Sequence, residues 1–95
     1  MRIIEHHADA HQFVYEQDGL RCVLDYQLEQ TPGAPTIMAI THTGVPSALE
    51  GQGIAADLAR TALETAQSQD WKVRPVCSYI DAYMRRHPQY QALRP

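Results

Sequence analysis

The most informative segment of the sequence is Val45-Pro46-Ser47-Ala48-Leu49-Glu50-Gly51-Gln52-Gly53-Ile54-Ala55. It lies where the residue pattern changes from that of a strand to that of a helix. Gly51 and Gly53 let the backbone approach an anion without a Cβ in the way. The first turn of a helix adds unpaired N–H groups and a partial positive charge. The stretch therefore predicts an anion site, with a simple tight turn as the alternative.

Two common nucleotide-binding loops do not fit this stretch. No lysine follows the glycines, which excludes the phosphate loop of nucleoside triphosphatases. The G-x-G-x-x-G spacing of dinucleotide-binding folds is also absent, and the preceding chain reads as an antiparallel meander.

Beyond the glycines, apolar residues recur every four positions, and this period predicts a helix over 51–68. A strand is expected over 71–77, with Val73 among its apolar residues. A second helix is expected over 78–87, with Ser78 as its N-cap and Pro88 ending it.

Before the quoted stretch, three strands are predicted, over residues 11–17, 20–29 and 36–43. The second alternates between apolar and polar residues, which is typical of a half-buried strand. The third has apolar residues on both faces, which is typical of a central strand covered on both sides. His6 and His7 fall in an N-terminal stretch that we expect to be frayed.

Asp18-Gly19 predicts a two-residue hairpin turn, because both central residues of such a turn adopt positive φ. A turn there pairs Tyr15 with Cys22 and Phe13 with Leu24. The apolar sides of the two strands then agree, so Cys22 is expected in the core.

The predicted order is β-β-β-α-β-α, an α+β architecture with a mixed, mostly antiparallel sheet and helices packed on it. The 95 residues favour a single domain over 1–95. Hydrophobic residues make up 44% and charged residues 20%, which is globular composition.

The formal net charge of −3 makes nucleic acid a poor partner, because phosphate-backbone binding needs clustered Lys and Arg. No apolar run approaches the ~20 residues needed to span a bilayer, so no membrane association and a cytoplasmic location are expected. Cys22 and Cys77 are then expected as thiols. No Cys or His pair has the spacing of a zinc site, so no metal is predicted.

The segment Glu50-Gly51-Gln52-Gly53-Ile54-Ala55 resembles the acetyl-CoA pyrophosphate loop of the GNAT N-acetyltransferase superfamily, Q/R-x-x-G-x-G/A. Glu50 departs from the first position of that motif. The resemblance extends over roughly residues 12–90 through three further segments: Thr41–Pro46, Pro75–Tyr79 and Arg86–Tyr90. Together they are similar to a small, stand-alone subgroup that lacks the N-terminal helices forming the acceptor site of full-sized enzymes.

The resemblance implies a truncated acyl-CoA N-acyltransferase fold with acetyl-CoA as cosubstrate. It assigns the pyrophosphate to the loop at Gly51 and to the backbone N–H groups of the next four residues: Gln52, Gly53, Ile54 and Ala55. It assigns the pantetheine arm to the end of the preceding strand, at Thr43, Gly44 and Val45.

Three residues are candidates for the chemistry. Cys77 precedes a predicted helix, a position that favours the thiolate form, and the resemblance places it near the CoA sulfur as acetyl acceptor or acid. His42 ends a strand and is the candidate general base, because histidine titrates near neutral pH. Tyr79 is the candidate acid, whereas Tyr83 falls on the face expected to be buried. A buried structural thiol and a hydrogen-bonded strand histidine are the alternatives for the first two.

Two functions follow. The first is an N-acetyltransferase that moves acetyl from acetyl-CoA to a primary amine on a small molecule or protein. The second is a CoA- or acyl-CoA-binding module without efficient turnover, since the missing helices leave an open site that orients an amine poorly. A partner protein or a second subunit is a candidate to complete that site.

Overall fold

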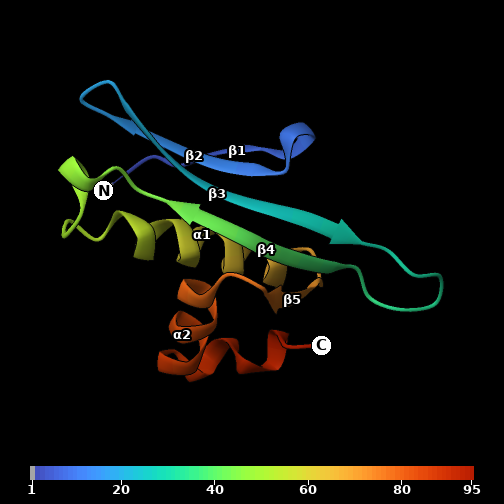
Figure 1. Cartoon of the computed structure of the whole chain (residues 1–95). Helices are drawn as coiled ribbons and strands as arrows, with labels where there is room; N and C mark the ends of the chain where they lie inside the picture. Colours follow the sequence, from blue (N-terminus) through green and yellow to red (C-terminus); the bar gives the residue numbers. More distant parts are fainter. Residues whose placement is uncertain (1) are drawn as a thin grey trace.

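The computed structural model describes residues 2–95 as a five-stranded sheet with helices packed on it (Figure 1). The strands, in chain order and also in sheet order, are β1 (Glu5–His7), β2 (Gln12–Gln17), β3 (Leu20–Glu29), β4 (Ile37–Gly44) and β5 (Lys72–Pro75). The helices are α1 (Ile54–Ser68) and α2 (Ser78–Arg86), with short 3₁₀ turns at Ala8–Ala10, Ser47–Leu49 and Pro88–Leu93. Neighbouring strands are antiparallel except β4 and β5, which are parallel and joined through α1. The predicted α+β fold with a mixed, mostly antiparallel sheet is confirmed.

The hairpin between β2 and β3 forms as predicted. Asp18 has φ 54° and Gly19 has φ 75°, the positive values that a two-residue turn requires. The register pairs Tyr15 with Cys22 and, two residues further, Phe13 with Leu24. Cys22 is fully buried, which confirms its place in the core.

The expectation of a frayed N-terminal stretch was wrong, because β1 pairs with β2 along His6 and His7. The ring of His6 stacks on Phe13 with centroids 4.1 Å apart. Its Nε2 also lies 2.7 Å from the hydroxyl of Tyr26, within hydrogen-bonding distance. These contacts are made with residues that are distant in the sequence. The short polar segment itself therefore contains no pattern that predicts a strand.

His6 makes the stability of the fold depend on pH. Burial lowers the pKa of His6, and the nearby His7 and His11 act in the same direction. The unfolded chain therefore binds more protons than the folded protein near pH 6, and the free energy of unfolding is expected to fall as pH drops from about 7 through the ordinary histidine value of about 6.5. Urea unfolding at a series of pH values tests this, with His6→Gln expected to flatten the dependence. An identical slope in both proteins would contradict it.

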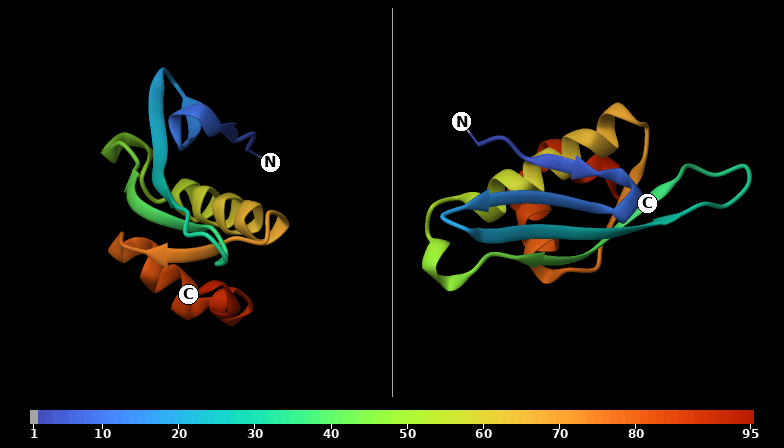
Figure 2. Two further views of the ribbon diagram at one scale, coloured as in Figure 1. Left: turned by 90° about the vertical axis from the view of Figure 1, so that its right-hand side faces the viewer. Right: turned by 90° about the horizontal axis from the view of Figure 1, so that it is seen from above.

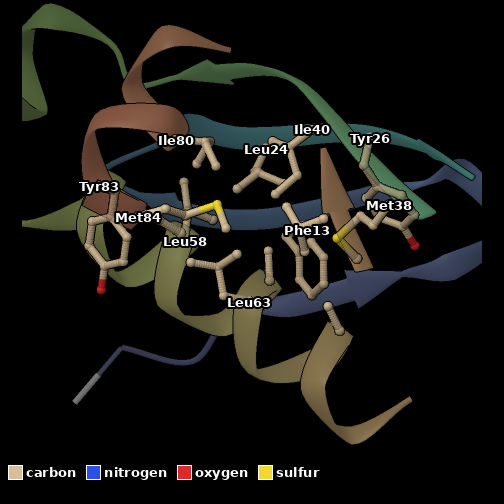
Figure 3. Packing of buried hydrophobic residues seen from close by; sticks show 14 of the residues in the cluster. Phe13, Leu24, Tyr26, Met38, Ile40, Leu58, Leu63, Ile80, Tyr83 and Met84 are labelled. Atoms are coloured by element: carbon tan, nitrogen blue, oxygen red, sulfur yellow. The ribbon is translucent and has the colours of Figure 1, made fainter. Parts of the chain in front are cut away.

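The two helices and the sheet share one hydrophobic core (Figure 3). Helix α1 packs against β2 to β5, whereas α2 packs against β4, β5 and α1. Figure 2 shows α1 lying under the strands in the view from above. Leu58 and Leu63 of α1 meet Ile80 and Met84 of α2, and all four are fully buried. The helix predicted over 51–68 starts at Ile54, since Gly53 is its N-cap.

Strand β5 is shorter than predicted and ends at Pro75 rather than Cys77. The N–H of Val76 donates to the carbonyl of Arg74, 3.0 Å away, which interrupts the strand, while the N–H of Cys77 still donates to the carbonyl of Ile40 on β4, 2.9 Å away. The N-cap of α2 is therefore Cys77, not Ser78, which is the first helical residue.

Strand β4 contains a β-bulge. Tyr26 pairs with Ile40 and Asp25 pairs with His42, which leaves Thr41 without a partner on β3. The extra residue changes which face the following side chains occupy, because side chains alternate along a strand. The bulge sits next to the pocket described below.

Candidate functional site

A pocket of about 550 Å³ opens between the end of β4, the start of α1 and the start of α2. Its lining comes from three segments: Thr43, Gly44 and Val45; Leu49, Glu50, Gly51, Gly53, Ile54 and Ala55; and Tyr79. Eight of these ten residues are sequence-predicted site residues. Leu49 and Glu50 were not predicted as lining residues, and Gln52, His42 and Cys77 do not line the pocket.

The stretch between β4 and α1, residues 45–53, is called the glycine loop below. Gly51 and Gly53 have φ values of 85° and 84°, which L side chains rarely adopt. A Cβ at Gly51 would meet nothing within 4 Å, so backbone conformation rather than crowding requires that glycine. The two glycines thereby allow the sharp turn between the 3₁₀ turn Ser47–Leu49 and the N-terminus of α1.

The start of α1 presents unpaired backbone donors. The N–H of Asp57 donates to the carbonyl of Gly53, 3.1 Å away, and this is the first bond of the helix. The N–H groups of Ile54, Ala55 and Ala56 precede that bond and so have no carbonyl four residues back within the helix. Together with the dipole of a 15-residue helix, these donors suit a phosphate group.

The edge of β4 toward β5 is free beside the pocket. Pairing between the two strands ends at Ile40 and Pro75, although β4 itself continues to Gly44. Within residues 2–95, no strand pairs with Thr41–Gly44 on that side. Free backbone groups at a strand edge can hydrogen-bond an extended chain that carries amides.

The side chains of Thr43 and Cys77 are in contact beside the pocket, although only Thr43 lines it. Thr43 pairs with Leu24 and so faces the core side of the sheet after the bulge. The Cys77 thiol donates to the Thr43 hydroxyl over 3.7 Å. Cys77, the N-cap of α2, therefore contacts a residue that lines the pocket without lining the pocket itself.

Tyr79 projects from the first turn of α2 and lines the pocket directly. Burial raises the pKa of Tyr79, while the charge of Arg86 acts in the opposite direction. The phenol is therefore protonated at neutral pH and available as a hydrogen-bond or proton donor. Tyr83 is buried in the core, where the sequence placed it.

His42 occupies the other face of the sheet from Thr43. It pairs with Asp25 and is exposed. Its Nε2 lies 2.9 Å from the point where a Cβ on Gly44 would stand, so the imidazole covers that glycine. Thr43 and Tyr79 thus line the pocket together and Cys77 contacts Thr43, whereas His42 lies on the opposite face of the sheet, beside Gly44 and outside the lining.

Gln52 is turned away from the pocket. Its backbone carbonyl accepts a hydrogen bond from the Arg2 guanidinium, and its side-chain Oε1 accepts one from Gln17 at 3.1 Å. Arg2 was missed from the sequence because only the folded chain brings it beside the glycine loop. Glu50, in contrast, could have been predicted as a lining residue, because it occupies the first position of the loop motif.

Two further properties concern residues 2–95 as a whole. No three His, Cys, Asp or Glu side chains gather closely enough there to hold a metal ion. No helix in this part of the chain is both long enough and apolar enough to cross a bilayer.

Residues 12–93 match the protein family described as GCN5-related N-acetyl-transferase. Among known proteins, the chain is similar to Protein NATD1 of Gallus gallus, Mus musculus and Homo sapiens, each 35% identical over 92 residues. The aligned region covers 95% of this chain in each case and 80%, 80% and 78% of the three relatives, respectively.

Proposed function

The chain belongs to the GCN5-related N-acetyltransferase family, and we propose that it binds acetyl-CoA in the pocket and transfers the acetyl group to a primary amine. The observation that carries this proposal is the continuity of the pocket from the free edge of β4 to the N-terminus of α1. The pyrophosphate of CoA needs N–H donors and the pantetheine arm needs amide partners. The two ends of this pocket offer them in that order.

In this proposal the pyrophosphate binds at Gly51, Gly53 and the first N–H groups of α1. The positive φ values of the two glycines shape the loop that leads the backbone to these N–H groups. The pantetheine arm runs along Thr43–Val45, in the space that β5 leaves when it ends at Pro75. The thioester then lies toward Tyr79 and Cys77.

The reaction would proceed by attack of a neutral amine on the thioester carbonyl. The new C–N bond forms, the C–S bond breaks, and the CoA thiolate leaves. The amine loses one proton and the thiolate gains one. Tyr79 is the proposed proton donor to the thiolate, because it lines the pocket in its protonated form. His42, which is exposed beside Gly44, is the proposed acceptor of the amine proton.

Cys77 has two proposed roles that differ in covalent chemistry. It either assists the leaving thiolate as an acid or accepts the acetyl group and passes it to the amine. Its hydrogen bond to Thr43 and its place at the N-cap of α2 suit both roles. An acetylated Cys77 is detectable by intact-mass spectrometry, with Cys77→Ser as the blank.

A second candidate function is an acyl-CoA-binding module without efficient turnover. In residues 2–95 the segment before β4 contains no helix except the 3₁₀ turn Ala8–Ala10. Few residues are therefore present to form the binding site for the amine. Because correct orientation of the amine supplies much of the rate in acyl transfer, such a site would favour slow turnover. A partner protein or a second subunit is proposed to supply the missing wall if turnover is efficient.

The experiment is a calorimetric titration with acetyl-CoA, followed by a broad panel of amines. Micromolar binding is expected, and so is turnover that falls about 100-fold in Tyr79→Phe, the lower end of a general acid's usual contribution. Cys77→Ala and His42→Ala are expected to lower kcat as well. Binding without turnover across the panel would favour the binding module. Absence of acetyl-CoA binding by the wild-type protein would exclude both functions.

A further inference from the structure

The side chain of Arg2 binds the backbone of the glycine loop but does not line the pocket. Its Nη1 lies 2.6 Å from Oδ2 of Asp57 in the first turn of α1. Its Nη2 donates to the backbone carbonyl of Gln52 in the loop. The guanidinium also lies over the ring of Tyr15, 5.9 Å from its centroid. One side chain near the N-terminal end of the chain thus bridges the loop, the helix and the sheet.

The two contacts of Arg2 need the shape of a guanidinium. Its N–H donors are fixed in a planar fork, so two acceptors are held at once in a set geometry. A lysine ammonium carries the same charge on a single nitrogen. The Arg2 fork spans from Gln52 to Asp57, across Gly53.

Holding the Gln52 carbonyl has a consequence for the next N–H. The peptide bond is planar and trans, so the oxygen of Gln52 and the N–H of Gly53 point in opposite directions. Gly53 lines the pocket, whereas Gln52 and Arg2 do not. Gln17 fixes the same residue through its side chain, so the Gln52–Gly53 peptide is restrained from two points.

The charge of Arg2 is balanced within a small network, in which Arg2 and Arg60 both pair with Asp57 and Arg60 also lies 3.8 Å from Glu64. The hydrogen bond from Arg2 lowers the pKa of Asp57, so that carboxylate is ionised at neutral pH. A balanced ion pair attracts a distant anion weakly. The contribution of Arg2 is therefore geometric more than Coulombic.

We propose that Arg2 is a positioning residue for the diphosphate of the cosubstrate: it locks the Gln52–Gly53 peptide so that the Gly53 N–H faces the bound phosphate. This inference rests on the proposed function. It adds to that function a residue about fifty positions away in the sequence from the loop it orients.

The test compares Arg2→Gln and Arg2→Lys with Arg21→Gln. Arg21 is the control arginine, because it pairs with Glu16 over 3.6 Å on the β2–β3 hairpin and, within residues 2–95, forms no hydrogen bond or ion pair with the glycine loop. Both Arg2 variants are expected to weaken acetyl-CoA binding about tenfold, as loss of an orienting hydrogen bond near a charged group predicts. Arg21→Gln is expected to bind as the wild type does. Thermal unfolding by circular dichroism checks that every variant is folded.

Two readouts separate positioning from other roles. Binding of pantetheine, which lacks the diphosphate, is followed by NMR and is expected to be unchanged in the Arg2 variants. In the ligand-free protein, the Gly53 amide resonance is expected to shift in both Arg2 variants and not in Arg21→Gln. Equal loss of pantetheine and acetyl-CoA binding would mean general loosening and would overturn the proposal.

Other outcomes also test the role of Arg2 and the proposed function. Wild-type affinity in both Arg2 variants would overturn the proposal, and so would retention of affinity in Arg2→Lys alone, because charge would then be sufficient. Failure of the wild-type protein to bind acetyl-CoA would instead overturn the proposed function. The Gly53 amide shift in ligand-free protein would still report whether Arg2 controls that peptide.

Discussion

Gly53→Glu is expected to lower the affinity for acetyl-CoA about 100-fold or more in a calorimetric titration. Gly53 has φ 84°, where an L residue costs about 1–2 kcal/mol, roughly a factor of ten in affinity when the loop distorts. The glutamate also brings a negative charge to a site whose N–H donors and helix dipole favour an anion, and this opposes the phosphates further.

Two controls separate the effects of strain and charge. Gly33 has φ 79° and lies in the β3–β4 loop, where an added Cβ would meet nothing within 4 Å. That loop projects at the opposite end of the molecule from the glycine loop (Figures 1 and 2). Gly33→Glu, with the same strain and charge, is expected to leave binding unchanged. Gly53→Asn, which tolerates positive φ, is expected to fall between wild type and Gly53→Glu. Unchanged binding in Gly53→Glu would rule out the glycine loop as the pyrophosphate site.

Leu58→Ala is expected to lower the free energy of unfolding by about 2–5 kcal/mol, as measured by urea denaturation. Leu58 is fully buried on α1 and lies between the sheet and α2 (Figure 3). Its removal leaves a cavity that the surrounding side chains fill only in part. Small domains are stable by about 5–15 kcal/mol in total, so this single change removes a large share of the stability.

Ile3→Ala is the matched control, because Ile3 is a large aliphatic residue that is 81% exposed. Its loss is expected to change the free energy of unfolding by less than about 0.5 kcal/mol. Equal effects of the two substitutions would mean that α1 is not packed on the sheet as described.

The predictable part of the fold came from local patterns. The turn at Asp18-Gly19 was predicted because only a few residue types adopt positive φ at both positions. The span of α1 followed from apolar residues spaced at four, and the anion site at the glycine loop followed from two glycines before a helix. In each case the signal lies within a few consecutive residues.

The parts that were missed depend on distant residues. Strand β1 is held by His6 stacking on Phe13 and by Tyr26, so its own sequence looked unstructured. Arg2 reaches Asp57, 55 residues away in the chain. Strand β5 ends at Pro75 because the N–H of Val76 bonds back to Arg74, and no residue pattern around Val76 predicted that bond.

The site residues divide in the same way. The pocket lining, which includes Tyr79 of α2 as well as the glycine loop, was expected from the resemblance to the GNAT superfamily, whereas the orientation of His42 was not predicted. Its face is set by the bulge at Thr41, and a bulge depends on pairing with β3. The predicted catalytic roles of Cys77, His42 and Tyr79 remain predictions, which the kinetic variants will test.

The bulge in β4 also determines how this segment can vary during evolution. Replacement of the exposed Thr41 by another residue leaves the alternation of side chains intact. Deletion of Thr41 would remove the bulge and let His42 follow Ile40 directly, while His42 keeps its pairing with Asp25 and Thr43 keeps its pairing with Leu24. Homologous chains are therefore expected to vary at residue 41 in its presence as well as its identity, whereas the residues after it keep the same faces.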